Sequence, residues 1–298
     1  MARDLSFNPE RLVRRREVNN RIVTIMCYIV LGFVLLFLFL PLFLTIITMF
    51  KNKQEVFPQE FHLFPYAWTL DNFSYLLYLP YTSIQLNYFG ALGMTLLVAV
   101  IATVLSLFVN SLAGYGFARL AFPGKKIIWI IVIMTMFIPG ITILLTSIEV
   151  VSTLGMMNTI WVLVIPGVAS AYNIFFFRQF YLGFPKDYDE SARVDGCNSF
   201  SIFFRIYLPS SSTPMVIMGA GTFMGYFNSY LWPTLTIDGD HKGLMQIMTI
   251  INKLFNDSTE LGYGVVLAAA FIALIPAVVI FIIVQRYIKE GIALTGVK

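Results

Sequence analysis

Long runs of apolar residues alternate with polar segments along this chain, and six of the runs are long enough to cross a bilayer as α-helices. A crossing helix needs about 20 predominantly apolar residues. The six predicted membrane helices cover residues 22–50, 86–112, 127–148, 160–180, 214–237 and 265–284. The first run is longer than one crossing requires, so its helix is expected to tilt or to extend beyond the hydrocarbon, and Pro41 can bend it. The pattern predicts an all-α integral membrane protein.

Basic residues are concentrated in alternate segments between these runs. Of the 20 Lys and Arg residues, 16 fall in four segments and four fall in two others. The four rich segments are residues 1–21, 119–126, 178–205 and 286–298, and the two poor ones are residues 51–85 and 238–264. Cytoplasmic segments of membrane proteins carry the excess of Lys and Arg. We therefore expect both termini in the cytoplasm.

The same asymmetry divides the chain into regions. The expected regions are a cytoplasmic N-terminal segment at 1–21, a first transmembrane helix at 22–50, an external loop at 51–85, a membrane core at 86–288 with a cytoplasmic loop at 181–210, and a cytoplasmic tail at 289–298.

Composition agrees with this assignment. Hydrophobic residues make up 58% of the 298 residues and charged residues only 12%, which lies far outside the balance of a soluble domain. A basic balance can indicate nucleic acid in a soluble protein, but here the positional bias of the basic residues accounts for it, so no nucleic acid is expected. The two cysteines, Cys27 and Cys197, are too few and too far apart to indicate a disulfide framework or a metal site.

One long polar run, residues 185–209, interrupts the apolar pattern. A helix is expected to begin at Pro185, with the acidic residues Asp187, Asp189 and Glu190 in its opening turns, where negative charge suits the helix dipole. Arg193 follows Asp189 by four positions, which places the two on one face of that helix. The run therefore presents a charged helix between two membrane spans.

A second short helix is expected in the same run. Gly196 can end the first helix, and Asn198 or Ser199 can cap the second. Pro209 is expected to stop it. Its apolar positions recur with helical spacing and form one face, consisting of Phe200, Phe203, Phe204, Tyr207 and Leu208. Two helices hinged at a glycine, one charged and one aromatic, favour docking of another protein.

The spacing within this run resembles a known signature. The EAA loop of permease subunits of ATP-binding-cassette importers is written E-A-A-x3-G-x9-I-x-L-P. The positions in register are Glu190, Ala192, Gly196, Ile206, Leu208 and Pro209, with Ser191 in place of the first alanine. The alternative is an ordinary amphipathic loop of another membrane protein.

This resemblance implies an importer-permease architecture in which the loop docks an ATPase subunit. Glu190 and Arg193 would make the polar contacts, and Gly196 would form the turn. The packed face would consist of Phe200, Phe203 and Phe204. The implied partners are two cytoplasmic ATPase subunits, a second and different but homologous permease subunit, an external solute-binding protein and the lipid bilayer of a prokaryotic cell membrane.

The chain lacks the residues for nucleotide chemistry. It contains no G-x-x-x-x-G-K-[ST] loop to cradle phosphates, and its two histidines both fall in the predicted external segments. The chain is therefore not expected to be an enzyme or to hold a cofactor. ATP and Mg²⁺ would belong to the partner ATPase subunits.

Carbohydrate importers are the subgroup that the chain resembles. The tail R-Y-I-K-E-G-I-A-L-T-G-V-K and the pairs Phe227-Asn228 and Trp232-Pro233 look like the six-helix permease subunit of the maltose-transporter type. A sugar or oligosaccharide is the implied substrate. Importers of glycerol phosphate share these patterns, and an amino acid importer remains an alternative with the same mechanism.

A secondary transporter or uniporter belongs to a different class. Ion-coupled carriers keep an ionisable residue within the membrane, and none of the six predicted spans contains one away from its ends. This argues against coupling to an ion, although it leaves a uniporter open.

The predicted fifth span carries the candidate substrate contacts. Gly221 and Gly225 have the small-xxx-small spacing of helices that pack closely. Farther along, Asn228, Ser229 and Tyr230 are successive and cannot all face one cavity in a helix. Asn228 or Tyr230 is expected to line the substrate path, and the alternative is hydrogen bonding between helices.

Overall fold

The computed structural model describes residues 9–56, 62–79 and 85–295. The ends of the predicted terminal segments, residues 1–8 and 296–298, lie outside this range. The described residues form the helices α1 (Pro9–Thr48), α2 (Lys53–Val56), α3 (Asp71–Tyr78), α4 (Tyr88–Arg119), α5 (Lys125–Thr135), α6 (Gly140–Thr153), α7 (Ile160–Val164), η2 (Ile165–Gly167), α8 (Ala171–Leu182), α9 (Asp187–Val194), α10 (Ser199–Ile202), η3 (Phe203–Tyr207), α11 (Leu208–Ser210), α12 (Ser212–Phe227), α13 (Leu231–Thr236), η4 (Lys242–Leu244), α14 (Ile247–Asn256), α15 (Ser258–Leu261) and α16 (Tyr263–Thr295). The fold is all-helical over the described residues, as predicted.

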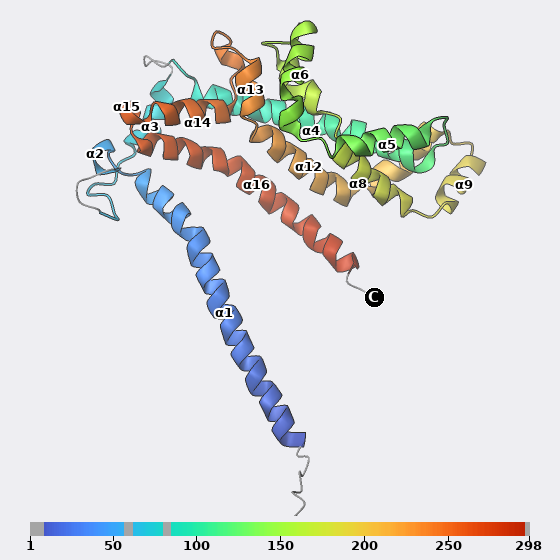
Figure 1. The fold of residues 1–298 in the computed structure, drawn as a ribbon, viewed down its shortest axis with the longest axis horizontal. Coiled ribbons are helices and arrows are strands. Elements are labelled where there is room, and N and C mark those ends of the chain that lie inside the picture. Colours follow the sequence, from blue (N-terminus) through green and yellow to red (C-terminus); the bar gives the residue numbers. More distant parts are fainter. Residues whose placement is uncertain (1–8, 57–61, 80–84, 296–298) are drawn as a thin grey trace, which may run out of the picture.

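Helix α4 is the centre of the bundle, and α8 and α12 pack along it (Figure 1). Gly114 allows α4 and α8 to approach closely, since a Cβ atom at this position would lie 2.7 Å from the Cβ of Phe177. Helix α16 packs in turn on α12, α14 and α3. Gly114, a small residue near the end of α4, therefore brings two helices together.

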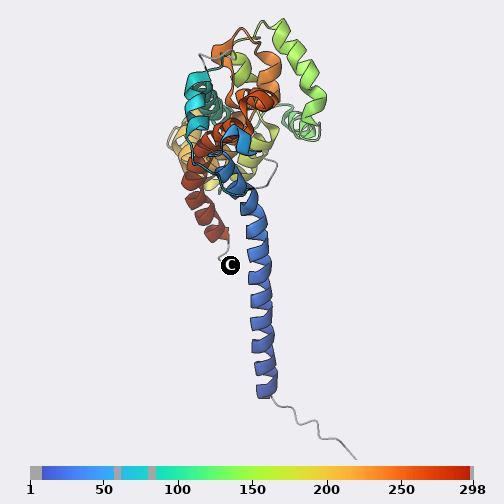
Figure 2. The same ribbon diagram turned by 90° about the vertical axis from the view of Figure 1, so that its left-hand side faces the viewer.

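Helix α1 projects away from the other helices (Figures 1 and 2). Its side chains from Arg21 to Leu44 are exposed, and it meets the bundle only near its end, where it contacts α16. An apolar helix without a protein covering fits the hydrocarbon of a bilayer or the surface of another membrane protein.

Three helices are long and apolar enough to cross a membrane within the described chain. They cover Arg21–Thr48, Tyr88–Arg119 and Tyr263–Tyr287. These correspond to the predicted spans at 22–50, 86–112 and 265–284. The last two continue beyond the predicted ends: α4 runs to Arg119 and α16 to Thr295.

The predicted third span, residues 127–148, is not one continuous helix. Helices α5 and α6 are separated by a short break and meet at an angle of 107°. Pro139 lies directly before α6 with φ −60°. A proline has no N–H to donate and disfavours helical geometry in the preceding residue, so the apolar run does not continue through it.

The predicted fourth span, residues 160–180, is also bent. Residues Ile160–Gly167 and Ala171–Leu182 are both helical and meet at 45°. The break is stabilised by a buried side chain of α4, because Asn110 Nδ2 donates to the carbonyl of Val168 at 2.8 Å and Asn110 Oδ1 accepts from the N–H of Ser170 at 2.8 Å. Irregular backbone at membrane depth requires partners of this kind, and here one amide side chain supplies two.

The predicted fifth span, residues 214–237, ends early. Helix α12 stops at Phe227, and α13 begins at Leu231 after a break at residues 228–230. The prediction that Asn228 and Tyr230 occupy helical positions is therefore wrong. Ser229 lies between them in the same break.

The predicted external loop at 51–85 contains two short helices, α2 and α3, which the polar pattern did not indicate. Asn72, on α3, donates from Nδ2 to the carbonyls of Met49 at 2.8 Å and Lys51 at 2.9 Å. A Cβ atom at Gly264 would lie 2.5 Å from the same Nδ2. Asn72 thus holds the end of α1 against the start of α16.

These helices lie at the opposite end of the bundle from the polar run at 185–209. In Figure 1, α2, α3 and α15 are at the left and α9 is at the right. The segment predicted to be external and the segment predicted to dock an ATPase are therefore separated by the length of the bundle.

Candidate functional site

The first candidate site is the docking segment, residues 185–209. Helix α9 carries Asp187, Asp189 and Glu190 in its first turn, as the sequence predicts. Gly196 follows it with φ +77°, in the left-handed region that favours glycine. Asn198 Oδ1 then accepts from the N–H of Ser201 at 2.8 Å and caps α10. Both the turn and the cap are as predicted.

An ionic contact holds α9 to the end of α4. The Arg119 guanidinium lies 3.5 Å from Asp189 Oδ2, and the Tyr207 hydroxyl donates to the same oxygen at 2.8 Å. Asp189 therefore pairs with Arg119 of another helix rather than with Arg193, four positions along its own helix. Arg119 also lies over the Tyr207 ring, with 5.3 Å from Cζ to the ring centroid.

Both partners of the contact between Arg119 and Asp189 are largely buried. The side chains of Arg119 and Asp189 are only 8% and 14% exposed. Burial and the hydrogen bond to Asp189 both raise the pKa of the Tyr207 hydroxyl above its ordinary value, which itself lies well above neutral pH, so the hydroxyl is protonated and can donate. The contact fixes the docking segment on the bundle through α4.

The second half of the docking segment differs from the predicted helix. Residues Phe203–Tyr207 form a π-helical turn, in which the N–H of Leu208 bonds to the carbonyl of Phe203. Pro209 does not end the helix as was predicted, but lies within the next helical turn, α11. The wider turn suits the proline, because a proline ring clashes with the carbonyl four residues earlier in an α-helix.

The aromatic residues therefore do not form one outward face. Phe203 and Tyr207 are fully buried, whereas Phe200 is 66% and Phe204 46% exposed. The Phe203 ring packs 5.4 Å from the Tyr115 ring of α4. The expectation that Phe203 belongs to a docking face is wrong, because this side chain is part of the protein core.

The other residues expected to dock the ATPase subunit are likewise divided between buried and exposed positions. Ala192 is buried, and Ile206 and Leu208 are half-buried. The exposed members are Glu190, Ser191, Arg193, Gly196, Phe200, Phe204 and Pro209. The docking segment thus offers an acidic and basic helix surface next to two exposed phenylalanine rings.

The second candidate site is a cavity of about 700 Å³ between α4, α6, α7, α8, α12 and α13. Two aromatic residues of its lining are held by the carbonyls of α7. The Tyr226 hydroxyl donates to the carbonyl of Val164 at 2.9 Å, and Trp232 Nε1 donates to the carbonyl of Val162 at 2.8 Å. Gly167 leaves room for Tyr226, since a Cβ atom there would lie 2.5 Å from the Tyr226 hydroxyl oxygen.

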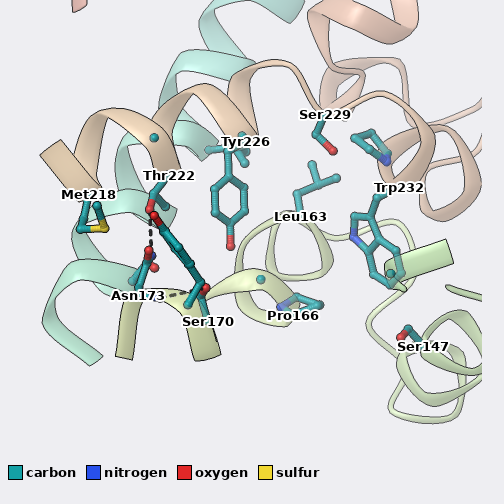
Figure 3. A pocket seen from close by; sticks show the side chains of 18 of the residues that line it. Ser147, Leu163, Pro166, Ser170, Asn173, Met218, Thr222, Tyr226, Ser229 and Trp232 are labelled. Atoms are coloured by element: carbon teal, nitrogen blue, oxygen red, sulfur yellow. Dashed lines mark hydrogen bonds between the residues drawn. The ribbon is translucent and has the colours of Figure 1, made fainter. Parts of the chain in front are cut away.

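Neutral polar side chains complete the cavity wall (Figure 3). Asn173 Nδ2 donates to Thr222 Oγ1 at 3.1 Å, which joins α8 to α12. Ser170 lies beside them at the start of α8, and Ser147 lies on α6. None of the described residues that line this cavity is Asp, Glu, Lys, Arg or His.

The residues predicted from the sequence to line a substrate path, Asn228 and Tyr230, lie beside this cavity and not in its wall. Asn228 and Tyr230 are exposed and do not line it, whereas Ser229 between them does. The Tyr230 hydroxyl instead donates to Asn252 Oδ1 at 3.0 Å.

Two glycines also have a different role from the expected one. Gly221 and Gly225 face the cavity, and a Cβ atom added at either would meet nothing within 4 Å. They do not bring helices together. Gly219 has that role, since a Cβ atom there would lie 3.1 Å from Leu107 of α4.

The cavity residues on α6, α7 and α8 were not anticipated from the sequence. The sequence does indicate the helix breaks that form this part of the cavity. The pairs Pro139-Gly140 and Pro166-Gly167 lie inside predicted spans, and proline and glycine mark breaks in helices.

Within the described chain, no group of three His, Cys, Asp or Glu side chains is placed to hold a metal ion.

Comparison with known proteins identifies the family. Residues 110–293 match the family described as "Binding-protein-dependent transport system inner membrane component". The match covers more than half of the chain, which therefore belongs to this family of membrane transport subunits.

Two relatives cover nearly all of the chain. It is 29% identical over 262 residues to the arabinooligosaccharides transport system permease protein AraQ of Halalkalibacterium halodurans, covering 87% of this chain and 90% of the relative. It is also 29% identical over 296 residues to the polygalacturonan/rhamnogalacturonan transport system permease protein YtcP of Bacillus subtilis, covering 94% and 100%.

A solved structure has the same fold. A chain of a bacterial ABC transporter involved in the import of the acidic polysaccharide alginate superposes with a TM-score of 0.76 at 20% identity, covering 90% of this chain and 97% of the other. The described helices thus have the arrangement of an ABC importer permease.

Proposed function

We propose that this chain is the membrane-spanning subunit of an ATP-driven importer and forms a translocation path for a sugar or oligosaccharide. The observation that carries the proposal is the docking segment, which is anchored by Arg119 and Asp189 and leaves Glu190 and Phe200 exposed. A rigidly attached surface of this kind can transmit a movement from a partner to the bundle.

The proposed topology has six crossings with both termini in the cytoplasm. Helices α1, α4 and α16 are three of these crossings, and the two bent pairs supply two more. Helix α12, extended by α13 after its break, is the sixth. The docking segment then lies on the cytoplasmic side, which is the side where ATP is available and where the Lys and Arg residues are concentrated.

The proposed assembly contains two permease chains, this one and a homologous but different second chain. Two cytoplasmic ATPase subunits bind ATP and Mg²⁺, and an external solute-binding protein delivers the substrate. The binding protein is supported by the family description, and the exposed apolar surface of α1 supports contact with lipid or with the second permease. This chain itself contributes no catalytic residue.

A carbohydrate substrate is supported by the named substrates of the relatives and by the cavity. Tyr226 and Trp232 offer aromatic rings, and the neutral side chains around them offer hydrogen-bond donors and acceptors. A secondary transporter is disfavoured because its coupling requires an ionisable residue in the path, and the described cavity lining has none.

Reversing one exposed charge on α9 tests the function. Glu190→Lys should leave folding intact, because the side chain is exposed and the helix-dipole cost is only about 0.3–1 kcal/mol. The tagged chain, purified from its native membrane, should lose the co-purifying ATPase subunit, and cells should lose uptake. Asp257→Lys is the control, since it reverses an exposed acid at the opposite end of the bundle. Wild-type uptake and a full complement of ATPase in Glu190→Lys would contradict the proposal.

A further inference from the structure

The wall of the cavity between α4, α6, α7, α8, α12 and α13 is electrically neutral over the described residues. Its polar side chains are hydroxyls and amides, and no described residue in the wall carries a charge. A carboxylate or phosphate leaves water at a high cost unless a cation or several N–H groups replace its hydration. A saccharide without charged groups enters the same space by exchanging hydroxyl hydrogen bonds with water for hydrogen bonds with the wall.

Two of the three aromatic residues in the described cavity wall, Tyr226 and Trp232, have fixed orientations, and Tyr172 is the third. Tyr226 and Trp232 each use their polar atom to bond a carbonyl of α7, so neither ring can rotate freely. A pyranose or furanose ring has a face of C–H groups that packs on an aromatic ring, and a preoriented ring lowers the entropy lost on binding. Figure 3 shows both side chains on the cavity, with Ser229 between the positions where they leave the chain.

Polar side chains occupy the other parts of the wall. Ser170, Asn173 and Thr222 form a group next to Tyr226, and Ser147 faces the cavity from α6. The cavity volume of about 700 Å³ lies within the range of about 300–1,000 Å³ that is usual for small-molecule sites. Aromatic faces with neutral hydrogen-bonding groups match a saccharide in both shape and chemistry.

We propose that this cavity holds an uncharged saccharide unit and excludes uronates and sugar phosphates. The inference rests on the proposed importer function and specifies the substrate class within it. It separates this chain from the alginate importer with the same fold, whose named substrate is an acidic polysaccharide. Among the relatives, it groups the chain by substrate with the arabinooligosaccharide permease and separates it from the polygalacturonan/rhamnogalacturonan permease, whose named substrate contains acidic galacturonate units.

Protection of an introduced thiol tests this inference. Ser229→Cys is made in a chain in which Cys27 and Cys197 are replaced by serine, and the transporter is purified with its co-purifying subunits. Labelling by N-ethylmaleimide, a small uncharged reagent, is followed on this chain by mass spectrometry. The probes are arabinotriose and maltotriose, which are neutral, and trigalacturonate, which is acidic, all at the same concentration. Ser147→Cys on α6 provides a second, independent position in the wall.

Tyr230→Cys is the matched control, because position 230 is adjacent in sequence and exposed but outside the cavity wall. The neutral trisaccharides should slow labelling at 229 and 147 several-fold and leave labelling at 230 unchanged. Trigalacturonate should not slow labelling at any of the three positions. Equal protection by trigalacturonate, or no protection by any probe, overturns the inference.

The proposed function is measured separately in the same preparation. An ATPase subunit that co-purifies, together with absent or unselective protection, means that the importer function stands and the saccharide assignment fails. Absence of any ATPase subunit from the wild-type preparation means that the proposed importer function itself fails.

Discussion

Single residues determine how firmly the docking segment is held. Asp189→Ala removes the counterion of the buried Arg119 and the acceptor of the Tyr207 hydroxyl. Loss of one partner of a buried pair costs about 3–5 kcal/mol, so the purified protein should melt at a clearly lower temperature. Asp195→Ala, which removes an exposed acid from the same segment, should leave the melting temperature unchanged. An equal and small effect of both substitutions would show that the contact is not needed for stability.

A second residue-scale prediction concerns pH and the loop after α13. Asp238 Oδ1 lies 2.6 Å from His241 Nδ1, and this hydrogen bond, with the N–H groups of Asp240 and His241, lowers the pKa of Asp238. A carboxyl whose pKa is lowered by folding stabilises the protein above its unfolded pKa of about 3.9 and loses that effect as pH falls through its folded pKa.

Melting temperature measured against pH checks this expectation. Between neutral pH and about pH 4, Asp238→Asn should melt slightly lower than the wild type, and below that range the two should converge. The effect is small because both side chains are about half exposed, at 48% and 51%. Asp240→Asn, next to it and exposed, should not change the profile. A constant difference at all pH values would rule out the ionised carboxyl as its origin.

At the scale of elements, the break between η2 and α8 depends on one side chain of α4. Asn110→Leu leaves the N–H of Ser170 and the carbonyl of Val168 without their partner. Each buried unpaired group costs about 1–3 kcal/mol, so we expect a destabilisation of about 2–6 kcal/mol, measured by thermal unfolding in detergent. Ser147→Ala, which removes a polar group from a helix but breaks no contact between elements, is the control. Equal stability of the two variants would contradict this role of Asn110.

The docking segment allows a second test at the same scale. Phe200→Asp should preserve the fold and release the ATPase subunit, because this side chain is 66% exposed. Phe203→Asp should instead prevent folding, because it places a charge in a fully buried position next to Tyr115. Protein abundance and ATPase co-purification are measured for both. A stable Phe203→Asp protein that has lost only the ATPase would restore Phe203 to the docking face.

For the whole molecule, the prediction concerns the two ends of the bundle. A thiol introduced by Asp257→Cys should react with a membrane-impermeant reagent in intact cells. A thiol introduced by Ala121→Cys should react with the same reagent only after the membrane is permeabilised. Both positions are exposed, so access depends on the side of the membrane rather than on burial. Cys27 and Cys197 are replaced in both variants. Labelling of both positions in intact cells would disprove the proposed topology.

The sequence alone determined the features that depend on neighbouring residues along the chain. The acidic turn of α9, the left-handed Gly196 and the cap at Asn198 follow from local backbone chemistry. The apolar runs likewise indicated an all-helical membrane protein, because about 20 consecutive apolar residues have few alternatives to a crossing helix. The spacing from Glu190 to Pro209 gave the family, which the match to residues 110–293 confirms.

Only the tertiary structure decided which apolar residues face protein and which face outward. Phe200 and Phe203 are equivalent in an apolar pattern, because lipid, a partner and the core all favour apolar side chains, yet one is exposed and the other is buried. The partner of Asp189 is likewise on α4, 70 residues earlier in the chain at Arg119. The cavity depends on similar distant contacts, such as that of Tyr226 with Val164, because broken helices become stable only when other helices satisfy their backbone groups.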